Sequence, residues 1–270
     1  MPVIAMNQEM ASLGKDVAEA LASELKLEVA KNEVVDHVAG QIPMPSSLVR
    51  RVIEGKAGFI TRMTTDGKGV SNYVSEAVFE LATKGNVVIR GWGATYLLRE
   101  IPHIPCIRVC APMEQRIDWL KKRLNTDDED LCREELERSD AAHINNMQAR
   151  FGVTWGDPML YDMVLNTARL SVDACVGQVK ALLARPEFKE TPESVQKVKD
   201  LSLAAHVRAA LRQDFETASV NVMIVACQGA VLLKGMVADE SEIKGSERVA
   251  RAVSGVKSVA MDLKVIGGRR

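Results

Sequence analysis

The sequence is poor in several features that mark specialised proteins. Aromatic residues make up only 4% of the 270 residues, and the 35 Lys and Arg residues nearly balance the 36 Asp and Glu residues, which leaves a formal charge of −1. A chain without a basic excess gives no sign of a nucleic-acid partner or of an anionic membrane surface. No apolar run approaches the ~20 residues that a helix needs to span a bilayer, so we expect no transmembrane segment.

Cysteine and histidine are also scarce. None of the five cysteines forms a CxxC pair, and two of them lie in "IPCIRVCAP", which is typical of a strand. We therefore expect reduced, mostly packed thiols and no structural zinc site, which usually needs four ligands. His37 and His103 have no nucleophile arrangement nearby, and we expect both to be structural. The opening "MPVIAMNQEM" lacks the basic region of a secretory signal, so the cytoplasm is the expected location.

The chain does contain an alternation of apolar strands and amphipathic helices. Strands are expected over 2–6, 86–94, 104–112 and 161–167. Helices are expected over 33–62 with a break at "IPMPSS", and over 71–84, 114–124 and 171–184, with a loop at 64–69. This order predicts an α/β fold with a mostly parallel sheet that helices cover on both faces.

The pattern changes after a charged, proline-bearing linker. A helix is expected over 195–213, then two strands around the turn signal "QG" at 228–229, a helix over 239–253 and a last strand. These residues form a small α+β unit with the order α-β-β-α-β. We place the first domain at 1–188, the linker at 189–194 and the second domain at 195–270.

The stretch "NQEMASLGKDVAEALASEL" at 7–25 follows the first expected strand and resembles a phosphate-binding loop. Gly14 and Lys15 fit G-x-x-x-x-G-K-[ST], whereas Glu9 replaces the first glycine and Asp16 replaces the Ser/Thr. Backbone N–H groups at a helix N-terminus attract phosphate, and Lys15 would reach the β- and γ-phosphates. Taken alone, "LGKD" is more typical of an ordinary capped helix that follows a strand.

Further motifs extend this likeness to the rest of the chain. With "ASLGKDVAEALASEL", "NVVIRGWGATYLLREIP", "RVCAPMEQRI" and "WGDPMLYDMVLNT", residues 1–185 resemble the cytidylate kinase-like family of P-loop nucleoside monophosphate kinases. Residues 195–270 resemble a BON domain through "ACQGAVLLKGMV" and "VARAVSGVKSVAMDLKV". Three glycines lie at that family's glycine positions: Gly229, Gly235 and Gly255.

The first resemblance implies transfer of a phosphoryl group from ATP, with Mg²⁺, to a nucleoside monophosphate such as CMP. The cofactor-binding residues would be Ala11, Ser12, Leu13, Gly14, Lys15 and Asp16. Asp16 would contact Mg²⁺ through water, or would only place an anion on the first helical turn. The implied catalytic residues are Lys15, Arg133 and Arg138. The implied substrate-binding residues are Arg90, Gly91, Trp92, Gly93, His143, Arg150 and Asp162, and Asp162 is equally plausible as a structural residue.

Three departures from the family pattern favour a second hypothesis. The family's "GSGG" is "ASLG" here, and a Cβ at Ala11 or Leu13 costs about 1 kcal/mol or more if the loop needs positive φ. Trp92 replaces an arginine, where it would stack on a base or only pack, and His143 replaces a lid arginine. The alternative is therefore a protein that binds nucleotide without efficient transfer.

The residues leave the role of two further segments open. The charged segment 125–150 would form a lid over the phosphates, or only a solvated helix face. The BON-like unit would sense or tether a small ligand or a phospholipid, or would form homo-oligomers.

Overall fold

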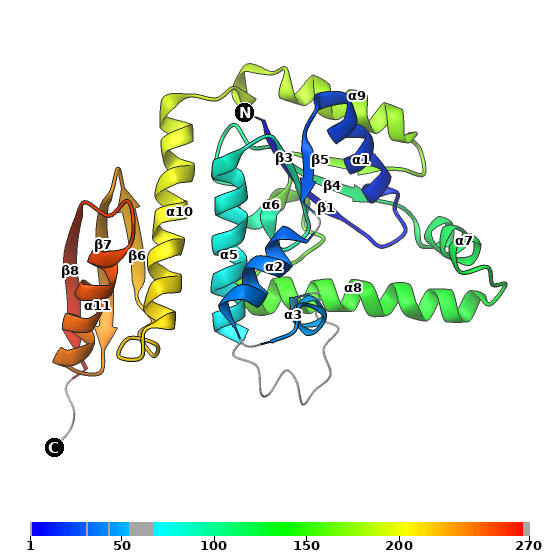
Figure 1. Ribbon diagram of the computed structural model, residues 1–270. Helices are drawn as coiled ribbons and strands as arrows, with labels where there is room; N and C mark the ends of the chain where they lie inside the picture. The colour runs from blue at the N-terminus through cyan, green and yellow to red at the C-terminus, as the bar shows by residue number, and fades with distance from the viewer. Residues whose placement is uncertain (1, 31, 43, 54–66, 267–270) are drawn as a thin grey trace. The chain divides into compact units, whose positions relative to one another are not determined.

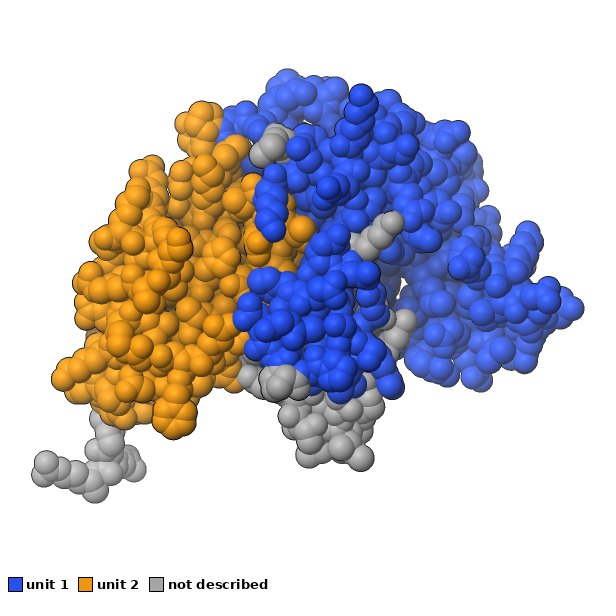
Figure 2. Space-filling view, in the orientation of Figure 1, with its two compact units in different colours: residues 1–65, 84–191 blue, residues 66–83, 192–270 orange. Residues whose placement is uncertain are grey.

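The chain divides into two compact units. The computed structural model describes residues 2–30, 32–42, 44–53 and 67–266. One unit comprises residues 1–65 and 84–191, and the other comprises residues 66–83 and 192–270 (Figure 2). The segment 66–83 thus groups with the C-terminal residues, although the sequence pattern placed it in the first domain. The limits 1–188 and 195–270 stay a prediction about which parts fold on their own.

The first unit is built on a five-stranded sheet. Its order is β2-β3-β1-β4-β5 and every pairing is parallel, which confirms the predicted parallel sheet. The strands are β1 (Val3–Gln8), β2 (Glu28–Ala30), β3 (Val87–Arg90), β4 (Cys106–Cys110) and β5 (Met163–Asn166). The strands β2 and β3, which follow β1 in the chain, lie on one side of it. The later strands β4 and β5 lie on its other side, so the strand order reverses at β1. Ligands of such sheets usually bind beyond the carboxyl ends of the strands at this reversal.

Helices cover both faces of this sheet. The helices α1 (Gly14–Leu25) and α9 (Val172–Leu183) bury their apolar sides against one face, in a core that includes Ile4, Leu21 and Val179. The short helix α6 (Ala94–Leu97) contacts β1 and β4. Smaller elements of this unit are α2 (Glu33–Gln41), α3 (Ser46–Ile53), η1 (Pro158–Leu160) and η2 (Pro186–Phe188).

The expected helix 114–124 is α7 (Met113–Leu124), and most of the charged segment 125–150 belongs to the long helix α8 (Glu129–Phe151). Asp128 caps α8, because its side chain accepts a hydrogen bond from the Leu131 N–H at 2.9 Å. The two helices pack together (Figure 1) through Ile117, Leu120, Cys132 and Leu136. The charges of α8 therefore surround a buried apolar stripe, and α8 is more than a solvated face.

Two local predictions differ from the structure. The three-residue strand β2 was not expected, because "EVA" is too short to show a period. Helix α5 (Gly67–Lys84) begins inside the expected loop 64–69. Part of the expected helix 33–62, residues 54–62, lies outside the described residues.

The second unit has a three-stranded sheet in the order β6-β7-β8, antiparallel between β6 and β7 and parallel between β7 and β8. Gln228 (φ 50°) and Gly229 (φ 94°) form the hairpin turn, in which both central residues have positive φ. The predicted order α-β-β-α-β is thus confirmed. Its elements are α10 (Pro192–Gln213), β6 (Met223–Cys227), β7 (Ala230–Val237), α11 (Glu240–Ala252) and β8 (Ser258–Val265), and α5 joins this unit. In the described ranges, no helix has both the length and the apolar character needed to cross a membrane.

Thiol reactivity gives a direct test of this packing. Cys106, Cys132 and Cys175 are buried, Cys110 is half-buried and only Cys227 is exposed. Burial, helped by the charge of Asp162, raises the pKa of Cys106 to about 12. Because the thiolate is the reactive form, we expect iodoacetamide at about pH 8 to label Cys227 first and Cys106 only after unfolding. Peptide mass spectrometry over time would show the order, and early modification of Cys106 would contradict the packing of β4.

Candidate functional site

The loop between β1 and α1 passes through two residues with positive φ and leaves the start of α1 without a side-chain cap. Ala11 (φ 63°) and Leu13 (φ 58°) both lie in the left-handed region, which is unfavourable for residues other than glycine. Leu13 is the N-cap of α1 and no side chain caps this end. A Cβ on Gly14 would lie 2.6 Å from the Cβ of Gln8, so only glycine fits there. The first N–H groups of α1 can therefore meet an external anion.

The side chains of this loop divide into inward and outward groups. Lys15 is 61% exposed and its Nζ lies 3.8 Å from the Glu19 carboxylate, a loose contact. Asp16 is also exposed on the first helical turn. Ser12 is buried, and its hydroxyl donates to the carbonyl oxygens of Glu9 at 2.8 Å and Val109 at 3.2 Å. In this conformation Ser12 braces the loop, and the side chains of Lys15 and Asp16 reach solvent.

Two residues that the sequence reasoning missed hold the loop at the carboxyl end of β1. The Thr167 hydroxyl donates to the Ser12 carbonyl at 2.9 Å. Arg108, 6% exposed within β4, donates from Nη2 to the Glu9 carboxylate at 2.7 Å and lies 4.3 Å from the ring centroid of Trp155. A charged residue inside a strand that is buried on both faces must have a partner. That requirement was the signal in "CIRVC" that could have identified Arg108.

Four of the residues expected to bind the acceptor nucleotide lie at the carboxyl end of β3 and in the turn that follows it. Gly91 (φ 90°), Trp92 (φ 53°) and Gly93 (φ 75°) turn the chain with three positive φ values in a row. A Cβ on Gly93 would lie 2.6 Å from the Phe151 ring. The turn therefore fits directly against the C-terminal end of α8. Arg90, the last residue of β3, is in register with Met6 of β1.

His143 and Arg150 also come to this region from α8. The His143 ring stacks on Trp155 with centroids 4.9 Å apart, and Trp155 Nε1 donates to the Asn7 Oδ1 at 3.0 Å near the end of β1. Arg150 directly precedes Phe151, and burial lowers its pKa. No carboxylate among the described residues pairs with Arg150. A half-buried guanidinium without a counter-charge is suited to an anionic ligand.

Three of the expected site residues are not gathered with these groups. The Asp162 Oδ2 accepts a hydrogen bond from the Cys106 N–H at 2.7 Å. Cys106 is the first residue of β4, so Asp162 lies at the amino ends of the strands, away from the loop at their carboxyl ends. This position agrees with the alternative that Asp162 is a structural hydrogen-bonding residue. Arg133 contacts Glu114 and Glu129, both at 3.1 Å, and Arg138 contacts Glu135 at 2.9 Å. The Arg138 side chain is 70% exposed, and helical periodicity puts it opposite the buried stripe of α8.

Comparison with known families decides the identity of the first unit. The model of the "Cytidylate kinase-like family" matches residues 3–169. The chain belongs to the cytidylate kinase-like family. The model of the "BON domain" matches residues 199–267, so the chain also carries a BON domain.

The chain is also similar to individual proteins. A cytidylate kinase of Staphylothermus marinus is 28% identical over 112 residues, which span 42% of this chain and 62% of that protein, less than two thirds of its length. An uncharacterized protein from Eubacterium ventriosum, 18% identical, covers 68% of this chain and all of its own with a TM-score of 0.54. A shikimate kinase from Bacteroides thetaiotaomicron, 13% identical, covers 68% of this chain and 99% of its own with a TM-score of 0.43.

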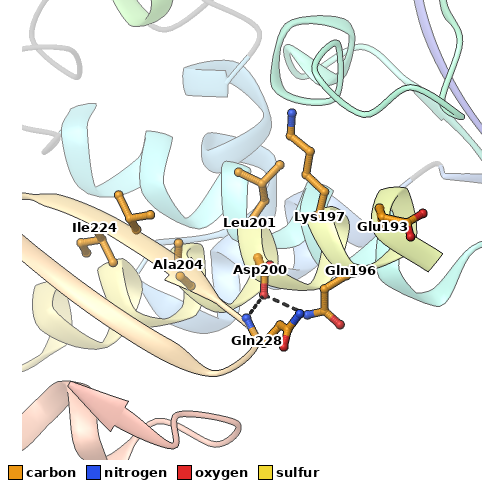
Figure 3. A pocket seen from close by; sticks show the side chains of 10 residues that line it. Glu193, Gln196, Lys197, Asp200, Leu201, Ala204, Ile224 and Gln228 are labelled. Carbon is orange, nitrogen blue, oxygen red and sulfur yellow. Dashed lines mark hydrogen bonds between the residues drawn. The ribbon is translucent and has the colours of Figure 1, made fainter. Parts of the chain in front are cut away.

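The BON domain of this cytidylate kinase-like chain has a pocket of about 450 Å³ between α10 and β6. Its apolar wall includes Leu201, Ala204 and Ile224. At its polar end, the Asp200 carboxylate accepts hydrogen bonds from the Gln228 N–H at 2.7 Å and from the Gln196 amide at 2.9 Å (Figure 3). The pocket thus joins an apolar wall to a fixed carboxylate.

Proposed function

We propose that the chain binds ATP at the loop formed by residues 9–16 and transfers the γ-phosphoryl group to a nucleoside monophosphate, with CMP as the first acceptor to test. The observation that carries this proposal is the α1 N-terminus without a side-chain cap, which follows a left-handed loop beyond the carboxyl end of β1. Phosphoryl transfer needs mainly charge neutralisation and positioning, which these groups supply. Membership of the cytidylate kinase-like family supports the same reaction class.

In this proposal the loop amides and Lys15 hold the donor phosphates. Mg²⁺ supplies charge neutralisation when it is bound. The residues present fit Mg²⁺ only in part. Asp16 is exposed on the first turn of α1, next to the loop. However, no group of three His, Cys, Asp or Glu side chains gathers anywhere in the described ranges. Asp16 would therefore hold the ion through water, and phosphate oxygens would supply the remaining ligands, as is common for Mg²⁺.

The acceptor would lie beside the Gly91–Gly93 turn, near the side chains that the C-terminal part of α8 contributes. Arg150 would meet its phosphate, while Trp92 and His143 would contact the remainder of the molecule. Asp162 is left out of this site because of its position. Arg133 and Arg138 would reach the phosphates only after their glutamate contacts are exchanged, and they stay candidates for a closed lid.

The half-buried guanidinium of Arg150 leads to a test in which stability and binding move in opposite directions. We expect Arg150→Met to raise the free energy of unfolding of the ligand-free protein by about 1 kcal/mol, because an unpaired guanidinium no longer has to be desolvated. The same change should weaken binding of the acceptor at least about tenfold. Thermal melting and calorimetry with CMP would measure both effects. A loss of stability with unchanged CMP affinity would show that Arg150 has a structural role.

The direct test of the proposal is a coupled assay with ATP and Mg²⁺ against CMP, dCMP, UMP and AMP. Turnover with one of these acceptors supports a nucleoside monophosphate kinase and identifies its substrate. No turnover with any of them, in protein shown to be folded by melting, would overturn the kinase proposal.

A second candidate is a nucleotide-binding regulatory protein without efficient transfer. It is favoured by the side chains at Ala11 and Leu13, which keep positive φ although they are not glycine, and by Trp92 and His143 where the family has arginines. ATP binding by calorimetry without turnover would support it. In that case the BON pocket would take the regulating molecule, which we propose to be a small amphipathic compound with an apolar body and a hydrogen-bond donor facing Asp200.

A further inference from the structure

Two buried arginines lie under the phosphate-binding loop and connect it to α8. Arg108 is 6% exposed and Arg116, from α7, is 3% exposed. Buried guanidinium groups are stable only when their charge and donors are matched. Their partners are the carboxylates of Glu9 in the loop and Asp140 in α8.

Arg116 forms the connection between the loop and the helix. Its Nε donates to the Met10 carbonyl at 2.7 Å, and its two terminal nitrogens each donate to one oxygen of Asp140 at 2.8 Å. A planar fork on a carboxylate has one favoured geometry. The position of α8 is therefore fixed relative to the backbone of the loop.

Glu9, the neighbour of Met10, fixes the first residue of the same loop. Its N–H donates to the Val109 carbonyl at 3.1 Å. Its carboxylate accepts from Arg108 at 2.7 Å and from the Ala111 N–H at 3.1 Å, and lies 3.8 Å from Arg116. The residue that stands where a Walker motif has its first glycine is thus the centre of a buried ionic network.

This ionic network can hold the loop in a backbone conformation that two of its residues disfavour. Ala11 and Leu13 favour other backbone conformations, so a loop held only by its own preferences would leave the left-handed region. We propose that Glu9 and Arg116 are positioning residues that hold the loop in its phosphate-binding conformation and make α8 move together with it. The part of this inference that concerns phosphate rests on the proposed function; the part that concerns the loop and α8 does not.

The ligand-free test is amide hydrogen exchange on the full chain. Glu9→Gln and Arg116→Lys should raise exchange about tenfold in residues 9–16 and in α8 around Asp140, but less than about twofold in α9. The matched controls are Glu24→Gln and Arg185→Lys, which alter exposed ion pairs of the same unit. Unchanged exchange in the loop, or an equal rise throughout the unit, would overturn the inference.

The nucleotide test adds a rescue that a general loss of stability would not produce. Glu9→Gln should weaken ATP binding about tenfold, and adding Leu13→Gly should recover about fivefold, because glycine removes the strain that Glu9 no longer opposes. Failure of Leu13→Gly to recover affinity would overturn the positioning role. If the unaltered protein binds no nucleotide, the proposed function fails, while hydrogen exchange still decides the inference about the loop and α8.

Discussion

Gly14→Ala is expected to abolish nucleotide binding and to destabilise the first unit. The new methyl group would lie 2.6 Å from the Cβ of Gln8, an atom next to the backbone of β1 that cannot move without shifting the strand. Overpacking of this kind costs about 1–3 kcal/mol, which corresponds to roughly 2–4 °C in melting temperature for each kcal/mol in a unit of this size. Relief of the clash would displace the N-terminus of α1, whose N–H groups are the proposed phosphate ligands.

The chain offers a matched control for this substitution. Gly177 lies on the exposed side of α9 and a Cβ there meets no atom within 4 Å. Gly177→Ala should therefore stabilise the protein by up to about 1 kcal/mol, because alanine is the better helix former. Melting curves and ATP titrations of both variants would separate steric from propensity effects. Unchanged ATP affinity in Gly14→Ala would contradict the position of the loop.

The fold was largely predictable because its strands are apolar runs that end in recognisable turns. The runs around Ile4, Val88 and Ile107 are buried strands of a parallel sheet, and "QG" does form the hairpin turn. The strand β2 has only three residues and its single buried residue gives no period. The grouping of 66–83 with the C-terminal unit was not predictable either, since an amphipathic helix does not reveal which surface covers its apolar side.

Sequence motifs located part of the candidate site, and what they could not locate has a common physical origin. Sequence motifs identified the loop and its left-handed strain at Ala11 and Leu13. They could not separate the two ends of "YDMVLNT": Asp162 lies at the amino end of the strand, whereas Thr167 follows its carboxyl end and braces the loop. Glu9 was noticed only as a missing glycine, because its role depends on partners 99 and 102 residues away.

Lys15→Ala should remove most of the affinity for ATP while leaving the fold intact. A lysine at the start of a helix is unfavourable for the helix itself, since the N-terminus carries partial positive charge. Lys15 gains little in return, because its only recorded partner within the described residues is Glu19 at 3.8 Å in an exposed pair. The free energy of unfolding should therefore stay within about 0.5 kcal/mol or rise slightly.

The expected loss of binding follows from the same position. A charge-assisted contact contributes about 1.5–3 kcal/mol, so the ATP dissociation constant should rise about 10- to 150-fold. Lys180→Ala is the matched control, because Lys180 is an exposed lysine of the same unit that pairs with Glu24 at 2.6 Å and lies outside the loop. Calorimetry should show normal affinity for Lys180→Ala. Equal affinity in the two variants would mean that Lys15 does not face the phosphates, and the loop would then be only the start of an amphipathic helix.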